Sequence, residues 1–221
     1  MATSIIDDTL SAIETCGVVA VVRASSAERA LMAIEALVTN GITGIEVTFT
    51  TPDAEQVIAD CVTRWGSDAL IGAGTITATH QAALAAEAGA RFLVSPGSDE
   101  QVVSAMRETG LVTMPGALTP TEVMVATRLG AHVIKVFPGS LVGPSYLSAL
   151  RGPFPELRLM PTGGVSVDNL STWFASGAFA VGAGGDLVPS AAVEAGDVEE
   201  IGRRARAFAS ARDEVARSVA K

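Results

Sequence analysis

The chain has 221 residues, of which 48% are hydrophobic and 18% are charged, a composition that can bury one sizeable core. Its 15 basic and 24 acidic residues give a net charge of −9, which excludes the positive surface used to bind nucleic acid or anionic membranes. The same numbers exclude disordered and fibrous proteins. We therefore expect no nucleic-acid or membrane partner.

Two cysteines and the first ten residues bear on location. Cys16 and Cys61 are too few for a disulfide framework and lack metal-ligand spacing, so both are predicted to be small buried apolar residues. The first ten residues carry Asp7 and Asp8 and no basic segment before a long apolar run, so no signal peptide is expected. No apolar run reaches the ~18 residues of a membrane span. These features predict a reducing, cytoplasmic location.

The basic residues are unevenly divided between the two types. Thirteen of the 15 are arginines, and the only lysines are Lys135 and Lys221. A coding bias that replaces surface lysine by arginine would explain this ratio without any functional cause. With such a bias, however, a lysine inside the fold needs an explanation of its own.

Short β-branched segments alternate with longer amphipathic segments along the chain, a pattern typical of βα units around a parallel sheet. The predicted strands are residues 17–23, 44–49, 70–74, 92–95, 111–114, 132–136, 158–160 and 178–181. Helices are predicted at about 26–38, 52–65 and 79–88, and a helical segment is expected after each later strand.

Eight such units without a reversal of strand order predict an α/β fold, a compact (β/α)8 TIM barrel, as a single domain spanning residues 1–221. A doubly wound open sheet is the alternative. The last segment, 198–219, is predicted to be an amphipathic helix with four arginines on solvated faces: Arg203, Arg204, Arg206 and Arg212.

In a barrel, active-site residues lie at the carboxyl ends of the strands. Lys135 belongs to the apolar stretch His132-Val-Ile-Lys-Val-Phe-Pro138, where an unpaired ammonium is costly and the neutral, nucleophilic amine is favoured. Those surroundings are typical of a lysine that forms a Schiff base. The alternative is a lysine that extends to solvent or pairs with a carboxylate.

Glu46 presents the same situation with opposite charge. Alternation within Ile45-Glu-Val-Thr-Phe49 places it on the inner face of the predicted barrel. A carboxylate across from the amine could carry protons during carbinolamine formation and C–C cleavage, directly or through one water. A purely structural ion pair is the alternative.

Two glycine clusters, Thr162-Gly163-Gly164 and Gly182-Ala-Gly-Gly185, follow the last two predicted strands. Loops at these positions often bind phosphate through backbone N–H groups, although glycine also permits simple tight turns. His80 and His132 have no ligand partner at useful spacing, and no nucleophile triad or dinucleotide fingerprint is present. We expect no metal and no cofactor.

These residues together resemble the class I 2-keto-3-deoxy-6-phosphogluconate aldolase family, which also covers 4-hydroxy-2-oxoglutarate aldolases and a phosphogalactonate branch. The resemblance extends from about Gly17 to Val188. Its motifs are Val21-Val-Arg-Ala24, Ile45-Glu-Val-Thr48, Ile71-Gly-Ala-Gly-Thr75, Val94-Ser-Pro96, Met114-Pro-Gly116, Ile134-Lys-Val-Phe-Pro138 and Met160-Pro-Thr-Gly-Gly164.

The resemblance implies roles for individual residues. Lys135 would form the Schiff base with a small keto-acid substrate, and Glu46 would be the general acid and base, acting through a water. Residues matching the pyruvate pocket are Thr75, Pro96, Phe137 and Thr162, and those matching the phosphate site are Gly163, Gly164, Gly184 and Gly185. Family members are usually homotrimers without a cofactor, so the resemblance implies a homotrimer here.

Two positions depart from the family pattern. Thr50 stands where many members have an arginine that binds the substrate carboxylate, and Arg23 is similar to an arginine that could replace it. Gly185 stands where members often have a serine that helps hold the phosphate. The second departure leaves the preference for phosphorylated substrates open.

The expected reaction is reversible cleavage of 2-keto-3-deoxy-6-phosphogluconate to pyruvate and glyceraldehyde 3-phosphate. Within the same class, the galactonate epimer or an unphosphorylated keto acid such as 4-hydroxy-2-oxoglutarate is the alternative substrate. A function of another class would be a non-catalytic barrel that binds a phosphate ligand, with Lys135 and Glu46 as a structural pair.

Overall fold

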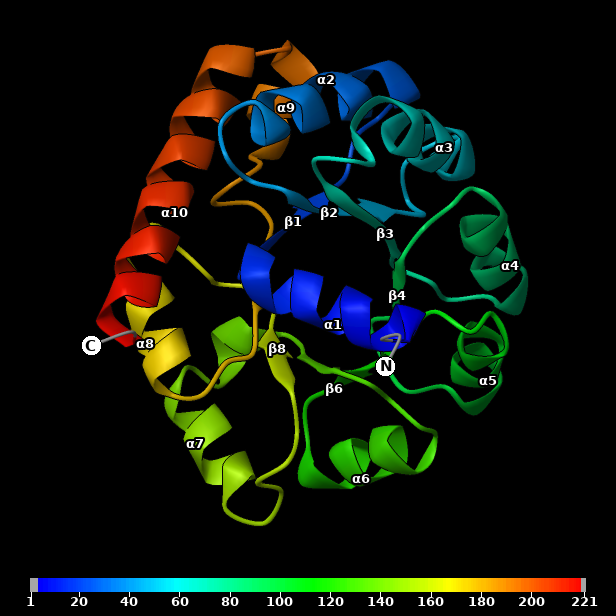
Figure 1. Cartoon of the computed structure of the whole chain (residues 1–221), viewed down its shortest axis with the longest axis vertical. Coiled ribbons are helices and arrows are strands. Elements are labelled where there is room, and N and C mark those ends of the chain that lie inside the picture. Colours follow the sequence, from blue (N-terminus) through cyan, green and yellow to red (C-terminus); the bar gives the residue numbers. More distant parts are fainter. Residues whose placement is uncertain (1–3, 220–221) are drawn as a thin grey trace.

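A computed structural model describes residues 4–219 of the protein; Lys221 lies outside the described residues. Helices surround a central group of strands, and the first helix crosses the middle of the view (Figure 1). The strands are β1 (Val18–Val22), β2 (Gly44–Thr48), β3 (Leu70–Gly74), β4 (Phe92–Val94), β5 (Val112–Met114), β6 (Gly116–Ala117), β7 (Ile134–Val136), β8 (Leu159–Pro161) and β9 (Val181–Ala183). The α-helices are α1 (Ile5–Cys16), α2 (Ala27–Val38), α3 (Ala54–Trp65), α4 (Thr79–Glu87), α5 (Glu100–Glu108), α6 (Pro120–Arg128), α7 (Ser145–Arg151), α8 (Leu170–Ala175), α9 (Ser190–Ala195) and α10 (Val198–Val219), with short 3-10 turns at Gly139–Leu141 and Val167–Asn169.

All the strand pairs are parallel. One sheet has the order β5-β4-β3-β2-β1-β9 and a second has the order β6-β7-β8. Pro115 connects β5 to β6 in the chain, and a parallel bridge between Thr162 and Gly182 links the ends of β8 and β9. The strand order follows the chain and the first strand pairs with the last, so the doubly wound alternative is wrong. The sheet is a curled, parallel α/β sheet, as predicted.

Polar residues fix the start of several helices. Ser26 accepts a hydrogen bond from the N–H of Arg29 at the start of α2, and Asp99 accepts one from Val102 at the start of α5. At α6, Thr119 and Glu122 form a reciprocal capping box. These caps satisfy N–H groups that would otherwise lack a partner, and so fix where each loop ends.

The strands have an apolar core on each face. The larger core lies between the strands and the surrounding helices and contains, for example, Ile45, Ile134 and Trp173. The smaller core consists of residues that point inward from the strands, such as Phe92 and Met160, together with Leu10 and Ile13 of α1. Helix α1 therefore covers the amino ends of the strands and leaves their carboxyl ends open to the loops.

Three elements differ from the sequence-based prediction. The strand predicted at 178–181 occupies 181–183 instead, because the segment after the turn at Gly177 first has to reach the sheet, where the Phe179 N–H bonds to the Leu159 carbonyl. Neither α1 nor the two-residue strand β6 was predicted. β6 is too short to show a period of two.

The final helix was predicted correctly, but its arginines were not. Arg204 and Arg212 are half-buried, and their guanidiniums donate to the backbone carbonyls of Asp186 and Gly41. The prediction of solvated faces is wrong for these two residues because α10 packs against α2, α8 and α9. Only Arg203 and Arg206 are exposed as predicted.

Two further predictions concern burial and the membrane. Cys16 and Cys61 are both buried free thiols, which confirms their prediction. Burial raises the pKa of Cys61 to about 12 and also raises that of Cys16. Among the helices of the described chain, none is long and apolar enough to cross a membrane.

Candidate active site

Lys135 and Glu46 lie in the strands β7 and β2 and face each other inside the sheet. The Lys135 Nζ is 3.8 Å from the Glu46 Oε1, and the two residues are 5% and 0% exposed. Their neighbours Ile134, Val136 and Ile45 point the other way, into the core beneath the helices. Strand alternation therefore brings together the two ionisable residues that the sequence singled out.

The Glu46 carboxylate is held by shape and not by hydrogen bonds. Neither of its oxygens accepts a hydrogen bond from a described residue, and its distance to Lys135 is longer than a hydrogen bond. It lies over Gly74 of β3, where a Cβ atom would overlap the carboxylate. Its lone pairs remain available to a substrate or a water, which is a requirement for a general base.

Thr162 follows β8 on the inner face of the sheet. Lys135 pairs with Met160 in the strand register, so Thr162 lies one inward position nearer the carboxyl end. Its side chain is buried and its Oγ1 has no hydrogen-bond partner among the described residues. A buried hydroxyl without a protein partner is uncommon and marks a position able to bind a polar ligand.

Phe137, Thr75 and Pro96 follow three different strands at this end of the sheet. The Phe137 ring is 37% exposed and its centroid is 5.1 Å from the Lys135 Nζ, so it covers the amine on one side. Thr75 has a φ of 55°, a left-handed conformation that is strained for a β-branched residue. Pro96 packs its carbonyl against Gly116 of β6.

Arg23 is anchored at the carboxyl end of β1. Its Nε donates to the Thr50 Oγ1 at 2.7 Å, and Thr50 is 2.9 Å from the Thr48 Oγ1. The Thr48 hydroxyl donates in turn to the Val22 carbonyl. At position 50 the family resemblance implies an arginine. In the structure Thr50 instead binds and positions Arg23, a role that was not predicted.

The two glycine clusters lie next to each other. The bridge between Thr162 and Gly182 places residues 163–164 beside the loop that follows β9. Gly163 and Gly164 have φ values of 92° and 73°, a region that residues with a Cβ rarely adopt. A Cβ at Gly164 would also overlap Ser140 of the β7–α7 connection. Ser140 was not predicted as part of this region, since its proximity depends on how two loops fold together.

The sequence predicts no metal site. Within residues 4–219 no three of His, Cys, Asp and Glu lie close enough together to hold a metal ion. His132 instead accepts the Thr113 N–H on its Nδ1, and burial lowers its pKa. This histidine supports the β5–β7 contact.

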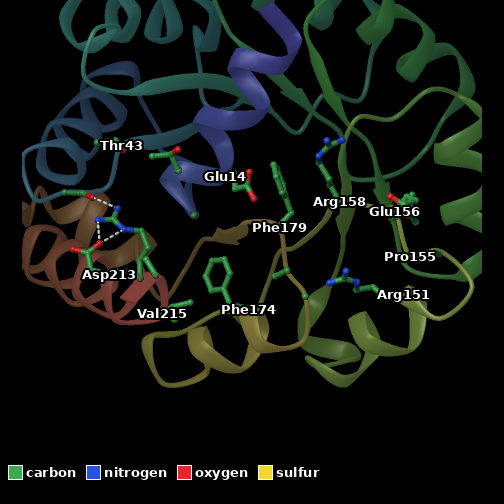
Figure 2. A pocket seen from close by; sticks show the side chains of 18 residues that line it. Glu14, Thr43, Arg151, Pro155, Glu156, Arg158, Phe174, Phe179, Asp213 and Val215 are labelled. Atoms are coloured by element: carbon green, nitrogen blue, oxygen red, sulfur yellow. Dashed lines mark hydrogen bonds and ion pairs between the residues drawn. The ribbon is translucent and has the colours of Figure 1, made fainter. Parts of the chain in front are cut away.

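A cavity of about 940 Å³ lies at the opposite end of the strands (Figure 2). Its walls include Gly17, Thr43 and Arg158, each just before a strand, and the rings of Phe174 and Phe179. Three arginines (Arg151, Arg158 and Arg212) and three acids (Glu14, Glu156 and Asp213) line it, so their charges balance. It contains none of the predicted site residues.

Comparisons with known proteins show which family the chain belongs to. The family model described as "Aldolase: KDPG and KHG aldolase" matches residues 9–204. A 2-dehydro-3-deoxy-phosphogluconate aldolase of Treponema pallidum is 37% identical over 191 residues, covering 86% of this chain and 90% of that protein. A probable 2-dehydro-3-deoxy-6-phosphogalactonate aldolase of Rhizobium meliloti is 37% identical over 183 residues, covering 82% of this chain and 86% of that protein.

A solved structure is similar over the same region. The KDPG aldolase from Legionella pneumophila, with pyruvate captured as a covalent carbinolamine, has a TM-score of 0.82 and 30% identity. The match covers 90% of this chain and 97% of the Legionella chain. The present chain therefore belongs to the KDPG and KHG aldolase family, and the protein is an aldolase, a carbon–carbon lyase.

Proposed function

We propose that the protein is a class I aldolase in which Lys135 forms a Schiff base with a 2-keto acid. The supporting observation is the buried Lys135 Nζ, 3.8 Å from a buried carboxylate that accepts no hydrogen bond from a described residue. The neutral form of an amine is the nucleophile, and a neighbouring carboxylate can take up the proton that the amine releases. The captured carbinolamine in the Legionella relative supports the same chemistry.

The reaction then proceeds in balanced steps. The Lys135 amine adds to C2 of the keto acid, and a proton passes from nitrogen to oxygen to give a carbinolamine. Uptake of one proton at the carbinolamine hydroxyl and loss of water give an iminium. The iminium accepts the electron pair of the C3–C4 bond as Glu46, through one water, removes the proton of the C4 hydroxyl. The aldehyde leaves, the enamine takes a proton at C3, and hydrolysis of the iminium releases pyruvate and the free amine.

The ends of the substrate fit two neighbouring parts of the site. The keto-acid carboxylate would pair with Arg23, whose side chain is fixed by Thr50. Thr162, Thr75, Pro96 and Phe137 would form the walls around the pyruvyl group. The backbone of the glycine clusters at residues 163–164 and 184–185 would take a phosphate.

These contacts favour 2-keto-3-deoxy-6-phosphogluconate as the substrate, cleaved to pyruvate and glyceraldehyde 3-phosphate. The galactonate epimer is a second candidate because relatives from Rhizobium meliloti and Escherichia coli are named as phosphogalactonate aldolases at 37% and 32% identity. The ratio of kcat/KM for the two epimers separates these substrates.

Borohydride trapping tests the Schiff base directly. Reduction in the presence of pyruvate should attach one pyruvate to Lys135, located by mass spectrometry of the digested protein. The variant Lys135→Met, which keeps an unbranched apolar side chain, should take up no pyruvate in its core peptide. An unmodified wild-type protein that has kept its native fold would refute the mechanism and favour a non-catalytic phosphate-binding barrel.

We further propose that the curled sheet is a closed eight-stranded barrel in one domain, in which β5 and β6, separated only by Pro115, count as one strand. We also propose that the protein assembles as a homotrimer. Backbone hydrogen bonds from Lys135 to Pro115 and from Thr162 to Val136 support continuity around the sheet. Assembly is supported by a similar chain, 30% identical, in a protein cage designed by fusing symmetric oligomeric domains. Light scattering on an eluting sample gives the mass that tests the trimer.

A further inference from the structure

The loop after β9 consists of Gly184, Gly185 and Asp186 and is called the β9 turn below. Its first carbonyl, that of Gly184, accepts the N–H groups of both Leu187 and Val188. In the part of the chain that the structure describes, the N–H groups of Gly185 and Asp186 have no backbone acceptor. A Cβ at Gly184 or Gly185 would meet no other atom within 4 Å. The β9 turn is therefore open on its outer side, and packing does not constrain its two glycines.

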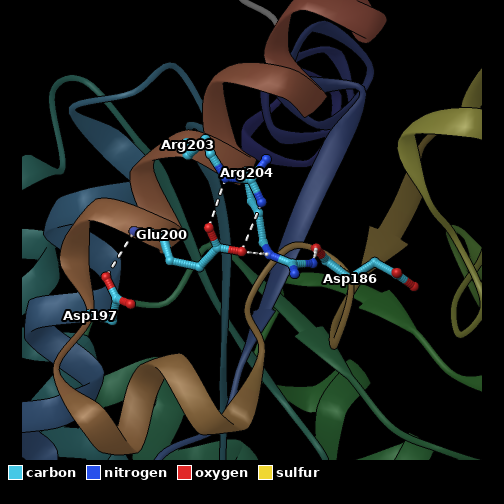
Figure 3. A network of polar contacts seen from close by, with 5 residues as sticks. All are labelled: Asp186, Asp197, Glu200, Arg203 and Arg204. Carbon is cyan, nitrogen blue, oxygen red and sulfur yellow. Dashed lines mark hydrogen bonds and ion pairs between the residues drawn. The ribbon is translucent and has the colours of Figure 1, made fainter.

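Helix α10 contacts the β9 turn through Arg204, whose side chain extends toward Asp186 (Figure 3). The Arg204 Nη1 donates to the Asp186 carbonyl at 2.7 Å, and its Nε donates to the Glu200 carboxylate at 2.6 Å. Glu200 also binds Arg203, and its N–H donates to Asp197 at the start of the helix. Hydrogen bonds from Arg203 and Arg204 hold the pKa of Glu200 at about 2, so the carboxylate is fully charged at neutral pH.

From these contacts we propose that Arg204, oriented by Glu200, is a positioning residue that fixes the β9 turn for the phosphate end of the substrate. The inference rests on the proposed function and adds a residue from the last helix to it. Arg204 contacts the turn through the Asp186 carbonyl. It therefore acts through the turn and not by contact with the reacting atoms.

The physical reason is the loss of freedom that binding requires. Two adjacent glycines give a loop more backbone conformations than other residues do, and ordering them opposes binding. Gly185 offers no hydroxyl, so the turn can hold a phosphate only through N–H groups whose directions depend on the backbone. An arginine with two hydrogen bonds orders the turn before the ligand arrives, which reduces the entropy lost on binding.

The charges near the turn partly cancel. The Arg204 guanidinium lies at the Asp186 carbonyl, and its positive charge is offset by the Glu200 carboxylate bound to its Nε and by the exposed Asp186 side chain. Removing the Arg204 side chain would remove the hydrogen bond to the Asp186 carbonyl and take a positive charge away from the turn. A phosphate, with nearly two negative charges, should be more sensitive to that change than the single carboxylate at the far end of 4-hydroxy-2-oxoglutarate.

The experiment compares two substrates and two matched arginines. Arg204→Met keeps an unbranched apolar stem and removes the guanidinium donors. Arg203→Met removes the exposed neighbour that binds Glu200 but does not touch the turn. KM and kcat are measured with 2-keto-3-deoxy-6-phosphogluconate and with 4-hydroxy-2-oxoglutarate. Calorimetry with glycerol 3-phosphate gives a dissociation constant that requires no catalysis.

The proposal expects an effect on KM at the phosphate end. Arg204→Met should raise KM for the phosphorylated substrate and the glycerol 3-phosphate Kd by about tenfold, with a much smaller change for 4-hydroxy-2-oxoglutarate. Arg203→Met should change neither. Arg204→Lys, which can still donate to the Asp186 carbonyl, should recover part of the lost affinity.

Two results would overturn the proposal. One is an equal loss of activity with both substrates, because that indicates a general structural role, and the other is an unchanged affinity for glycerol 3-phosphate in Arg204→Met. Pyruvate trapping at Lys135 separates this proposal from the mechanism, since trapping should persist in Arg204→Met. Absence of trapping in the wild type would refute the aldolase mechanism, whereas the glycerol 3-phosphate affinities would still decide the role of Arg204.

Discussion

The two ends of the strands differ in what they offer a ligand. The amino end has the cavity of about 940 Å³, with aromatic walls and six charged side chains whose charges balance. The carboxyl end has Lys135, 3.8 Å from the Glu46 carboxylate, and a buried Thr162 hydroxyl without a protein partner. The chain belongs to the KDPG and KHG aldolase family. This is the class of enzyme that the residues at the carboxyl end predict.

The comparison shows that the size of a cavity is a weaker guide to function than the state of its polar atoms. Folding normally pairs buried polar groups, and leaving one unpaired costs about 1–3 kcal/mol. Among the described residues, two carboxylate oxygens of Glu46 and the Thr162 hydroxyl are unpaired in one small region, which marks it as a candidate binding site for a polar ligand. At the amino end, by contrast, the cavity is lined by residues of α1, α7, α8 and α10 and by the loops before the strands.

The largest expected effect is at Glu46. Glu46→Gln keeps the shape over Gly74 and removes the base, so turnover should fall about 10²- to 10⁴-fold, while pyruvate trapping at Lys135 persists. Steady-state kinetics with a coupled pyruvate assay measures the change. Glu156→Gln at the amino end is the matched control and should retain wild-type turnover. Equal turnover in Glu46→Gln and wild type would remove Glu46 from proton transfer.

Gly74→Ala should give the next largest effect. The added methyl group would overlap the Glu46 carboxylate, so the carboxylate must move away from the amine. We expect kcat to fall by about tenfold or more and the free energy of unfolding to fall by about 1–3 kcal/mol, as for other overpacked interiors. Urea unfolding and kcat are measured on the same sample. Gly152→Ala, where a Cβ meets only an ordinary contact, should change neither, and a wild-type kcat in Gly74→Ala would show that the Glu46 position is not critical.

A change at the amino end should have little effect on catalysis. Arg151 lines the cavity and has no ion pair with a described residue, so Arg151→Met should leave kcat/KM within about twofold and stability within about 1 kcal/mol. The kinetic assay and thermal unfolding provide both numbers. A tenfold loss of kcat/KM would contradict the assignment of function to one end only.

The smallest effect concerns the two thiols. Burial raises the pKa of Cys61 to about 12 and raises that of Cys16, so both stay protonated and unreactive at pH 8. Because the folded-state pKa values are raised, the contribution of the protonated thiols to the free energy of unfolding is complete below about pH 9. That contribution is lost as the pH rises toward 12. Mass spectrometry after iodoacetamide treatment at pH 8 should show no label without urea and two labels with it. Rapid native labelling of Cys16, which lies in α1 at the amino end, would show that this end opens.

The sequence predicted the repeating architecture because β-branched alternation is a local signal that survives in most strands. The prediction missed α1, which closes the amino end through tertiary contacts that no local pattern reveals. It also misplaced β9, because the Phe179 N–H bonds to the sheet before the strand begins. Lys135 and Glu46 could be found because ionisable residues in apolar strands are rare. Their separation could not, since it depends on the register of strands that are not neighbours.

The supporting residues were harder to find for the same reason. Helical periodicity assigned Arg204 to a solvated face, but its partner is a backbone carbonyl 18 residues away in the chain, and no pattern of side chains reveals a carbonyl. Thr50 was noted only as a missing arginine, whereas in the structure it binds Arg23. Such contacts appear only once loops are placed next to one another.

The position of the single internal lysine also makes the chain its own reporter of unfolding. A protease that cleaves only after lysine has one internal site here, between Lys135 and Val136, and both residues are buried in β7. Cleavage therefore requires the central strands to separate, and it divides the chain into two fragments, 1–135 and 136–221. The rate of that single cut measures how often the segment around β7 opens, without any label. An adduct reduced onto Lys135 would block the cut and reveal its own occupancy on a gel.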